Sequence, residues 1–307
     1  MKRLYLFFAA LFFCLFPLSG QVLKVGSYNI RYHNAADSIR GNAWSQRGPH
    51  VAGILNYEQP DVFGAQEVLV DQLHNLLAWL PGYGYIGVGR DDGKEAGEYA
   101  AIFYRKEKVR LLDSGHFWLS ENPTVPGLGW DAVCVRICSW GRFKHLASGK
   151  KFYFFNLHMD HVGTTARREA ARLVVEKIRQ IAKGAPVVLT GDFNVDQHNE
   201  IYEIFTHSGL LADSYIVAEQ RFSPNGTFNS FDPDLLTESR IDHIFVSPST
   251  EVMHYAVRTD CYWSLAGNEG TVVTKKGNDA PQEISLQTYE RRLPSDHYPV
   301  FARIRIR

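Results

Sequence analysis

The stretch 187–197, V-V-L-T-G-D-F-N-V-D-Q, joins an apolar run and a glycine to a carboxylate and a carboxamide two residues apart. Side chains two apart in an extended chain point the same way, so we expect Asp192 and Asn194 to share one face while Phe193 turns into the core. The same Asp-x-Asn pattern is common in turns, where the side chains hydrogen-bond the local backbone. Taken alone, the stretch fits either a functional strand end or a plain turn.

Residues 1–20 have the pattern of a secretory signal peptide. Lys2 and Arg3 precede a short apolar run that ends in small residues, as in the charged and hydrophobic regions of such signals. The run is too short for a comfortable membrane span. We therefore expect an exported protein, periplasmic or extracellular, with no transmembrane segment after processing and a mature chain of residues 21–307.

The mature chain is expected to be almost neutral. The whole sequence has 33 basic and 33 acidic residues, so removing Lys2 and Arg3 leaves 31 basic against 33 acidic. This argues against a protein that binds long nucleic acid mainly by neutralising phosphates, and leaves short or single-stranded nucleic acid open as a partner.

Three cysteines remain after processing: Cys134, Cys138 and Cys261. The first two fall on one predicted strand, about 13 Å apart at strand rise, too far for a mutual disulfide. At most one disulfide, using Cys261, is expected. The small number of cysteines also argues against a thiolate zinc site.

Apolar patterns predict many strands and few helices, with no linker or internal repeat. Predicted strands lie at 22–31, 61–68, 85–90, 98–104, 117–120, 132–140, 151–161, 187–190, 241–246, 252–257 and 300–306. Predicted helices lie at 44–59, 70–80, 165–183 and 201–209. This balance favours one domain with two packed sheets and helices outside.

Polar side chains stand repeatedly at the ends of predicted strands, and in one case, Asp296 with His297, in a loop just before the last strand. They are Asn29, Glu67, His158 with Asp160 and His161, Asp192 with Asn194, Asp242 with His243, and Asp296 with His297. A single polar residue in such a place is more often a turn former or a solvated group. Six occurrences together are harder to explain as independent turns, so we expect several of them to form one site.

The residue types suggest phosphoester hydrolysis with a hard divalent cation. Glu67 and Asn29 offer oxygen ligands to Mg²⁺, which is usually held by one or two carboxylates plus the substrate phosphate. His158 and Asn194 can donate hydrogen bonds to the non-bridging oxygens as charge builds on the phosphorus.

A histidine base would complete this chemistry. His297 is the candidate, and an acid close to it would orient the imidazole and raise its basicity toward water. Asp242 and Asp296 both fit that role.

Six motifs follow one another along the chain: Y-N-I-R at 28–31, G-A-Q-E-V at 64–68, N-L-H-M-D-H at 156–161, G-D-F-N at 191–194, R-I-D-H-I at 240–244 and S-D-H-Y-P-V at 295–300. In this order they resemble the endonuclease/exonuclease/phosphatase superfamily, which includes deoxyribonuclease I, exonuclease III, bacterial sphingomyelinases, inositol polyphosphate phosphatases and the carbon catabolite repressor deadenylases. The resemblance covers essentially residues 22–307. It implies a four-layer α/β sandwich, two mixed β-sheets face to face with helices on both outer sides, and an active site at the mouth between the sheets.

The resemblance also implies a metal site. Glu67 would be the principal ligand of Mg²⁺, or of Mn²⁺ in its place, with Asn29 nearby and Asp296 as a further contributor. Glu98 stands where some members of the superfamily place a carboxylate that pairs with the equivalent of His158.

Further roles follow from the resemblance. Asp192 would orient or deprotonate the attacking water, and Asn194 and His158 would contact the scissile phosphate. His297, paired with Asp242, would be the base or a donor in the transition state. Members of the superfamily differ on whether the aspartate or the histidine takes the proton, so the roles are assigned to the pair.

Some segments depart from the well-studied branches. Arg31, the Gly-Trp-Asp at 129–131 and the stretch 261–292 have no assigned counterpart. The last could form a substrate rim or a solvated surface loop. No exposed apolar hairpin pair of the kind that docks a sphingomyelinase on a membrane is evident, and Tyr262 with Trp263 is the nearest candidate.

The leading hypothesis is a Mg²⁺-dependent phosphoester hydrolase, with phosphodiester cleavage favoured, that works as a monomer. The enzyme alternative is a lipid-, sugar- or inositol-phosphate phosphatase at the cell envelope. The remaining alternative is a non-catalytic binding module on the same scaffold, but such loss should have removed some of Glu67, His158, Asp192 or His297, and all four are present. The substrate stays open, since one fold serves many phosphoesters.

Overall fold

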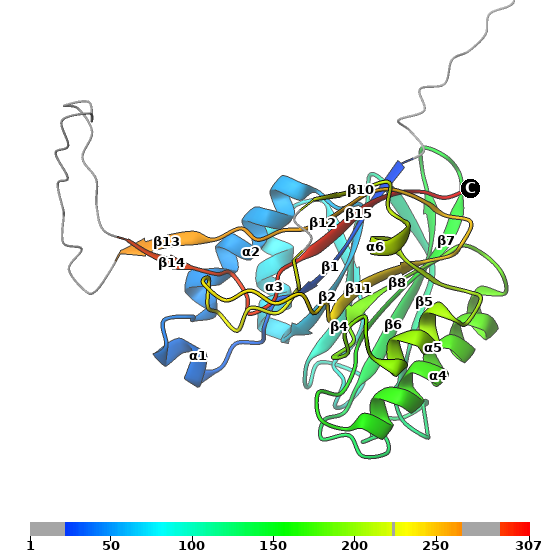
Figure 1. The fold of residues 1–307 in the computed structure, drawn as a ribbon, viewed down its shortest axis with the longest axis horizontal. Helices are drawn as coiled ribbons and strands as arrows, with labels where there is room; N and C mark the ends of the chain where they lie inside the picture. Colours follow the sequence, from blue (N-terminus) through cyan, green and yellow to red (C-terminus); the bar gives the residue numbers. More distant parts are fainter. Residues whose placement is uncertain (1–21, 223–224, 266–288) are drawn as a thin grey trace, which may run out of the picture.

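The computed structural model describes residues 22–222, 225–265 and 289–307. The predicted signal peptide and residues 266–288 of the unassigned stretch lie outside this described part. Within it, two large mixed sheets pack face to face and helices cover their outer faces (Figure 1). The predicted four-layer α/β sandwich is therefore confirmed. No helix in the described ranges is long and apolar enough to cross a membrane.

The first sheet has seven strands in the order β10-β12-β15-β1-β2-β4-β3. Its strands are β1 (Val22–Asn29), β2 (Val62–Val68), β3 (Tyr83–Ile86), β4 (Tyr99–Arg105), β10 (Gln220–Phe222), β12 (Glu251–Val257) and β15 (Val300–Arg305). Strands β1 and β2 run parallel, with Asn29 opposite Gln66. The carboxyl ends of both strands therefore reach the same edge of the sheet.

The second sheet has six strands in the order β5-β6-β7-β8-β11-β9. Its strands are β5 (Val109–Trp118), β6 (Ile137–His145), β7 (Lys151–His158), β8 (Val187–Asp192), β9 (Ala212–Asp213) and β11 (Asp242–Val246). Parallel pairing of β7 with β8 sets His158 opposite Asp192. Antiparallel pairing of β8 with β11 sets Asp192 opposite Asp242. The register thus aligns three predicted site residues on neighbouring strands.

Helices cover the outer face of each sheet (Figure 1). Helices α2 (Trp44–Glu58) and α3 (Val70–Trp79) cover the first sheet, and α4 (Thr164–Ala182) and α5 (Glu200–Thr206) cover the second. The short helices α1 (Ala35–Ile39) and α6 (Ser214–Val217) lie outside these two layers. Helix α4 buries the predicted apolar stripe, including Ala170, Val174 and Ile178, against the second sheet. Asp131 accepts hydrogen bonds from the amides of Thr165 and Ala166, so the unassigned Gly-Trp-Asp stretch caps the first turn of this helix.

The core between the sheets is apolar, and a buried amide crosses it. Val25 and Val62 of the first sheet share a cluster with Phe154 and Val188 of the second, and burial of each such side chain stabilises the fold by about 1.5–3 kcal/mol. This packing holds the two sheets at a fixed offset.

The buried amide belongs to Asn156 on β7. Its Nδ2 donates to the carbonyls of Ala65 and Ala101, and its Oδ1 accepts from Gln66 Nε2 at 2.6 Å. The gap for this amide exists because residue 64 is glycine, where an added Cβ would lie 2.2 Å from Asn156 Oδ1. The amide therefore ties β7 directly to β2 and β4, just behind the strand ends.

Some predicted elements differ from the structure. Strand β6 begins at Ile137, so the predicted strand 132–140 is wrong over 132–136. There the amides of Val133 and Cys134 donate to Asp160 instead of to a strand. Strand β5 begins at Val109, far before the predicted 117, because the polar, exposed face of this edge strand hides its alternation. Cys134, Cys138 and Cys261 are free.

The described ends of the unassigned stretch form a two-stranded ribbon, β13 (Tyr262–Leu265) with β14 (Tyr289–Arg292), which projects from the body (Figure 1). Its root is fixed, since the Tyr262 ring stacks on His50 at 3.9 Å between centroids. Trp263 is 62% exposed and Leu265 53% exposed. The ribbon was missed because its strands flank a long polar segment.

Candidate active site

Five strand ends, those of β1, β2, β7, β8 and β11, meet at one edge of the sandwich. A pocket of about 650 Å³ opens there. Its lining residues are Arg31, Tyr32, Glu67, Arg90, Glu98, Cys134, Arg136, His158, His161, Asp192, Asn194, Phe228, Ser230, Asp296 and His297. The predicted site residues that line it come from both sheets, so neither sheet alone contains the pocket.

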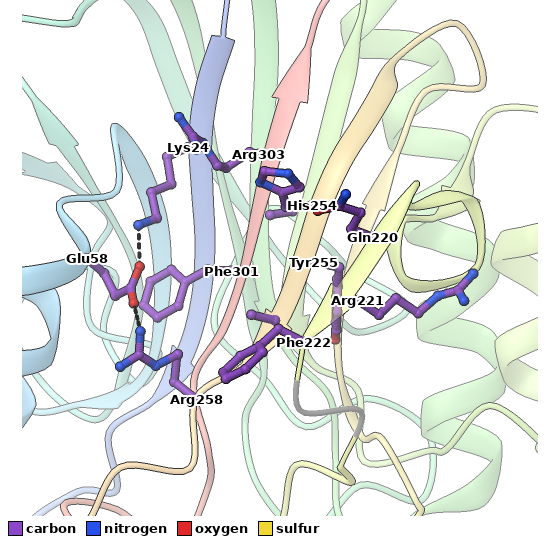
Figure 2. Close-up of a pocket in the computed structure, with 12 residues that line it drawn as sticks. Lys24, Glu58, Gln220, Arg221, Phe222, His254, Tyr255, Arg258, Phe301 and Arg303 are labelled. Carbon is purple, nitrogen blue, oxygen red and sulfur yellow. Dashed lines mark hydrogen bonds and ion pairs between the residues drawn. The ribbon is translucent and has the colours of Figure 1, made fainter.

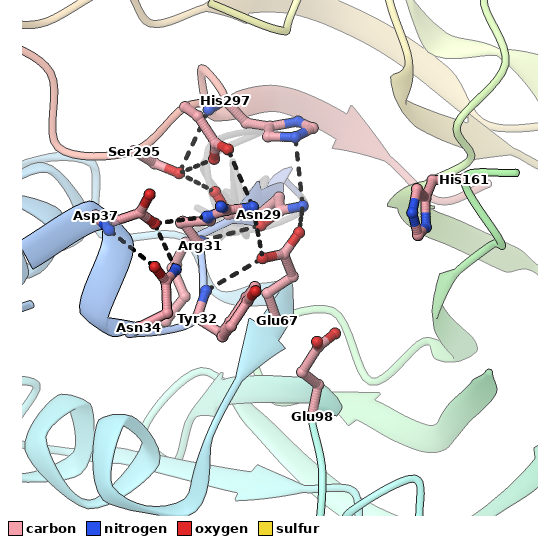
Figure 3. Close-up of polar contacts among 12 residues, drawn as sticks. Asn29, Arg31, Tyr32, Asn34, Asp37, Glu67, Glu98, His161, Ser295 and His297 are labelled. Carbon is pink, nitrogen blue, oxygen red and sulfur yellow. Dashed lines mark hydrogen bonds and ion pairs between the residues drawn. The ribbon is translucent and has the colours of Figure 1, made fainter. Parts of the chain in front are cut away.

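Asn29 is the hub of the polar contacts at the base of the pocket. Its Nδ2 donates to Glu67 Oε1 at 2.9 Å and to Asp192 Oδ2 at 3.0 Å, and lies 3.4 Å from His297 Nε2. Its Oδ1 accepts from the Arg31 amide at 3.0 Å. Figure 3 shows Asn29, Glu67 and His297 converging. The structure thus places Asn29 against three other predicted residues. Metal ligation by Asn29 stays a prediction, because its amide nitrogen faces the acids.

Glu67 is held in an uncommon backbone conformation. Its φ is 61°, in the left-handed region, where the β2–β4 pairing shifts register between Ala65 and Val68. A non-glycine residue in that region carries strain that surrounding structure must offset. Here the Tyr32 amide donates to Glu67 Oε2, and Arg31 Nη1 lies 3.8 Å from the same oxygen. The bulge therefore aims this carboxylate into the pocket.

Asp192 and Asn194 form both a strand end and a turn, the two alternatives that the sequence 187–197 left open. Strand β8 ends at Asp192, and Asn194 has a φ of 50°, so the expected extended arrangement does not continue past the aspartate. The Asn194 amide donates to Asp192 Oδ1, as in a turn, and its side chain donates to the Met159 carbonyl. Phe193 is fully buried, as predicted. Both polar side chains still line the pocket.

His297 lies between the carboxylates of Asp242 and Asp192. Its Nδ1 contacts Asp242 Oδ2 at 2.8 Å, and its Nε2 lies 3.7 Å from Asp192 Oδ2. Burial lowers the pKa of His297, but the carboxylates of Asp242 and Asp192 outweigh burial and hold that pKa well above its usual value. Of the two predicted partners, Asp242 contacts the imidazole, whereas Asp296 Oδ2 lies 3.5 Å from Arg31 Nη1.

The acids at the base of the pocket are buried close to one another. Burial raises the pKa of Asp192 to about 7, with Asp242 raising it further and His297 opposing. Burial and Glu67 also raise the pKa of Asp296. Asp242 Oδ1 is buried without a hydrogen-bond partner. These carboxylates would be stabilised by a cation.

Glu98 does not pair with His158 as closely as the resemblance implies. Glu98 Oε2 lies 2.5 Å from Arg90 Nη1 but 3.8 Å from His158 Nδ1. The guanidinium of Arg136 takes the nearer place, with Nη1 at 2.9 Å from His158 Nδ1. Burial, then Arg136 and Arg90, hold the pKa of His158 well below its usual value.

Two residues of the strand-end set do other work. Asp160 accepts four backbone amide bonds, from Val133, Cys134, Val162 and Gly163, and so shapes the loop after β7. His243 is not among the described residues that line the pocket. Its Nε2 contacts the Val195 carbonyl, and its ring packs in an aromatic cluster.

Three arginines in the pocket were not predicted as site residues: Arg31, Arg90 and Arg136. Arg31 contacts Asp37 Oδ2 at 2.8 Å through its Nε, and the other two flank Glu98. Arg136 is an unusual cation within an apolar run, V-C-V-R-I-C, which was the one available signal. Arg90 has no comparable signal, because its place depends on how the loop folds.

A divalent cation fits the donor set. The pocket lining has four carboxylates, those of Glu67, Glu98, Asp192 and Asp296, and Asp242 adds a fifth against His297. Three guanidinium groups, those of Arg31, Arg90 and Arg136, and His297, whose pKa is held well above its usual value, offset four of these charges. Ligand atoms of Glu67, His158 and Asp192 lie within 4.8 Å of one another. An anionic phosphate would be repelled by the acids at the base unless a cation lay among them, and oxygen-rich sets suit Mg²⁺ or Mn²⁺.

A second hollow, of about 390 Å³, lies on the first sheet (Figure 2). Phe301 forms part of its lining, and Glu58 is the one carboxylate among its described lining residues. Glu58 already pairs with Lys24 and Arg258. The described lining of this hollow therefore offers no free carboxylate for metal binding.

Comparison with known proteins gives close relatives among solved structures. A mannosyl-6-phosphatase from Bacteroides thetaiotaomicron is 50% identical, with a TM-score of 0.84 over 92% of this chain and 100% of that chain. An endonuclease/exonuclease/phosphatase from Bacteroides vulgatus is 38% identical, with a TM-score of 0.78 over 93% of this chain and 99% of that one.

More distant similarity extends to a curated nuclease. The CCR4-Not complex 3′-5′-exoribonuclease subunit Ccr4 of Debaryomyces hansenii is 22% identical, over 83% of this chain and 34% of its own length. The sequence model of the Endonuclease/Exonuclease/phosphatase family matches residues 26–297. Motifs, fold and relatives agree, and the chain belongs to the endonuclease/exonuclease/phosphatase family.

Proposed function

We propose that this protein is a divalent-metal-dependent phosphomonoesterase that removes a terminal phosphate from a phosphorylated sugar. Hydrolysis is supported most directly by one observation: the Asn29 amide contacts both Glu67 and Asp192 beside His297. The sugar is supported by the 50% identical neighbour, a mannosyl-6-phosphatase. The pocket volume of about 650 Å³ is typical of small-molecule sites.

The metal would be held by Glu67, with Asp296 as the second carboxylate. When bound, it supplies charge neutralisation and Lewis acidity at the phosphoryl group. The lining arginines then restrict the phosphate from the sides, and Asn194 and His158 donate to its non-bridging oxygens. Glu67 is suited to this role because its carboxylate is aimed inward by the bulge.

Proton transfer divides between Asp192 and His297. A pKa of about 7 suits Asp192 as the base that takes a proton from the attacking water. His297, whose pKa is held well above its usual value, is protonated near neutral pH and serves as a donor to the charge that builds on phosphorus. Asn29 holds the two groups together by donating to Asp192.

Phosphodiester cleavage is the competing activity. The sequence analysis favours this activity, and a distant relative named as an exoribonuclease supports it. However, the near-neutral charge of the chain gives no long electrostatic track for nucleic acid.

The deciding experiment is a substrate panel with the purified protein and Mg²⁺. It comprises mannose 6-phosphate, glucose 6-phosphate, nucleotides, inositol phosphates, sphingomyelin, DNA and RNA. We expect release of inorganic phosphate from sugar 6-phosphates, lost with EDTA and in Asp192→Asn. Faster cleavage of a diester would replace the proposal with phosphodiesterase activity. Binding without hydrolysis of any member would favour the non-catalytic alternative.

Export and a monomeric state are part of the proposal. Sequencing of the N-terminus of the secreted protein should show cleavage near Gln21. Size-exclusion chromatography with light scattering should give the mass of one chain, and a larger mass would contradict the monomer.

A further inference from the structure

Arg136 lies between two histidines of the pocket. It precedes β6, and its side chain is 5% exposed. Its Nη1 contacts His158 Nδ1 at 2.9 Å, and its Nη2 contacts His161 Nδ1 at 3.2 Å. The charge is balanced by Glu98 at 3.8 Å and Asp160 at 3.9 Å. One buried guanidinium thus contacts the Nδ1 atom of each of the two imidazoles.

The chemistry of the guanidinium fixes where the imidazole protons lie. All nitrogens of an arginine side chain are donors, so an imidazole nitrogen that contacts one has to be the acceptor. His158 Nδ1 and His161 Nδ1 are therefore unprotonated. A neutral imidazole then carries its proton on Nε2, and this proton is available for a second partner.

Both Nε2–H groups belong to residues that line the pocket. His158 Nε2 lies 3.5 Å from Asp192 Oδ2, at the base. His161 is exposed at the rim. Figure 3 shows it apart from the group formed by Asn29, Glu67 and His297. The His158 donor thus lies at the base of the pocket beside Asp192, and His161 lies at its exposed rim.

We propose that Arg136 is a positioning residue that holds His158 and His161 as Nε2–H tautomers, and that His161 is a substrate-contacting residue for the sugar beyond the phosphate. The second part rests on the proposed function. A carboxylate at Nδ1, the arrangement that the resemblance implies for Glu98, would instead draw the proton to Nδ1. His158 would then have to become charged to donate from Nε2, and Arg136 removes that requirement.

Nitrogen-15 NMR of the histidines tests the role of Arg136. In the wild-type protein we expect both imidazoles to be unprotonated at Nδ1 and protonated at Nε2, with signals assigned from single replacements. Arg136→Gln offers a carbonyl as well as donors, so Nδ1–H should appear. Arg136→Lys, which only donates, should restore Nε2–H at the imidazole it reaches. Arg110→Gln, an exposed arginine on β5, is the matched control and should change neither. Nδ1–H in the wild type, or an unchanged spectrum in Arg136→Gln, would overturn the assignment.

Ligand titration of the Asp192→Asn protein with Mg²⁺ separates the two histidines. Inorganic phosphate should shift the His158 signals alone, and mannose 6-phosphate should shift both. If phosphate alone shifts His161, or if the sugar phosphate never does, His161 does not contact the sugar. Because neither readout needs turnover, failure of the proposed function would not hide the outcome for Arg136.

Kinetics of His161 variants give an independent readout. His161→Leu removes the donor and should raise KM for mannose 6-phosphate roughly five-fold, the effect of one neutral hydrogen bond, with little change in kcat. His161→Gln keeps an N–H near the Nε2 position and should stay close to wild type. Phenyl phosphate has no hydroxyl to accept the bond, so its KM should not respond to either change. Equal effects on both substrates would assign His161 a structural role.

Discussion

Replacing Asp242 by asparagine removes the charge behind His297 while keeping its shape. Asp242 Oδ2 contacts His297 Nδ1 at 2.8 Å, and the second oxygen is buried without a hydrogen-bond partner. In the variant a neutral amide oxygen can still accept from Nδ1. A charge-assisted bond is about 1–1.5 kcal/mol stronger than a neutral one. We therefore expect kcat/KM to fall about tenfold.

The pH dependence of Asp242→Asn is the sharper readout. In the wild type, Asp242 is the first of the acids that raise the pKa of His297 against the effect of burial. Without its charge the pKa of His297 must fall. If the protonated imidazole is the donor, the alkaline limb of the kcat/KM profile moves to lower pH. The assay is steady-state hydrolysis of mannose 6-phosphate with saturating Mg²⁺ across the pH range.

Asp213→Asn provides the matched control. Asp213 is equally buried, pairs with Arg240 at 2.9 Å and lies outside the pocket lining. Its replacement should lower the Tm and leave the shape of the pH profile unchanged. An Asp242→Asn profile that matches the wild type in position and height would refute the reasoning, because the Asp242 charge would then not govern His297.

Four further outcomes are expected. Glu67→Gln should abolish the rise in Tm on adding Mg²⁺ while the protein stays folded by circular dichroism. Asp192→Asn should lower kcat by about 10²–10⁴, and a smaller loss would exclude Asp192 as the base. The pKa of Asp192 is raised, so Asp192 stabilises the metal-free protein below its ordinary pKa, and this stabilisation is lost as the pH rises through about 7. The rise in Tm on adding Mg²⁺, followed by calorimetry, should therefore be larger near pH 8 than near pH 6. Gly64→Ala should cost about 1–3 kcal/mol of unfolding free energy in urea titration, because its Cβ would meet Asn156 Oδ1 at 2.2 Å and Thr190 Oγ1 at 2.3 Å.

Strand-end motifs made much of the site predictable. Alternation and apolar runs locate β1, β2, β7 and β8, and the residue types at their ends suggest a metal and a phosphate. The extended-chain argument did not hold for Asn194, whose φ is 50°. Local sequence could not reveal this, because Asp-x-Asn is compatible with a strand end and with a turn, and here it is both.

The contacts between side chains of the pocket could not be predicted in the same way. The pairing of Asp242 with His297, 55 residues apart, and the distance of Asp296 from that imidazole depend on how the last loop crosses β11. Similarly, Arg136 reaches His158 only because the chain leaves the predicted strand over 132–136. Contacts between loops are set by tertiary packing, and strand periodicity gives no information about that packing.

The sequence by itself determined the family, the layered fold and the residue types of the site, because side-chain period and strand-end chemistry are local properties of the chain. Only the tertiary structure decided which acid faces His297 and that a guanidinium takes the place of a carboxylate beside His158. These depend on the offset between two sheets, and that offset is fixed by the packing of Val25, Phe154 and their neighbours and by the Asn156 amide.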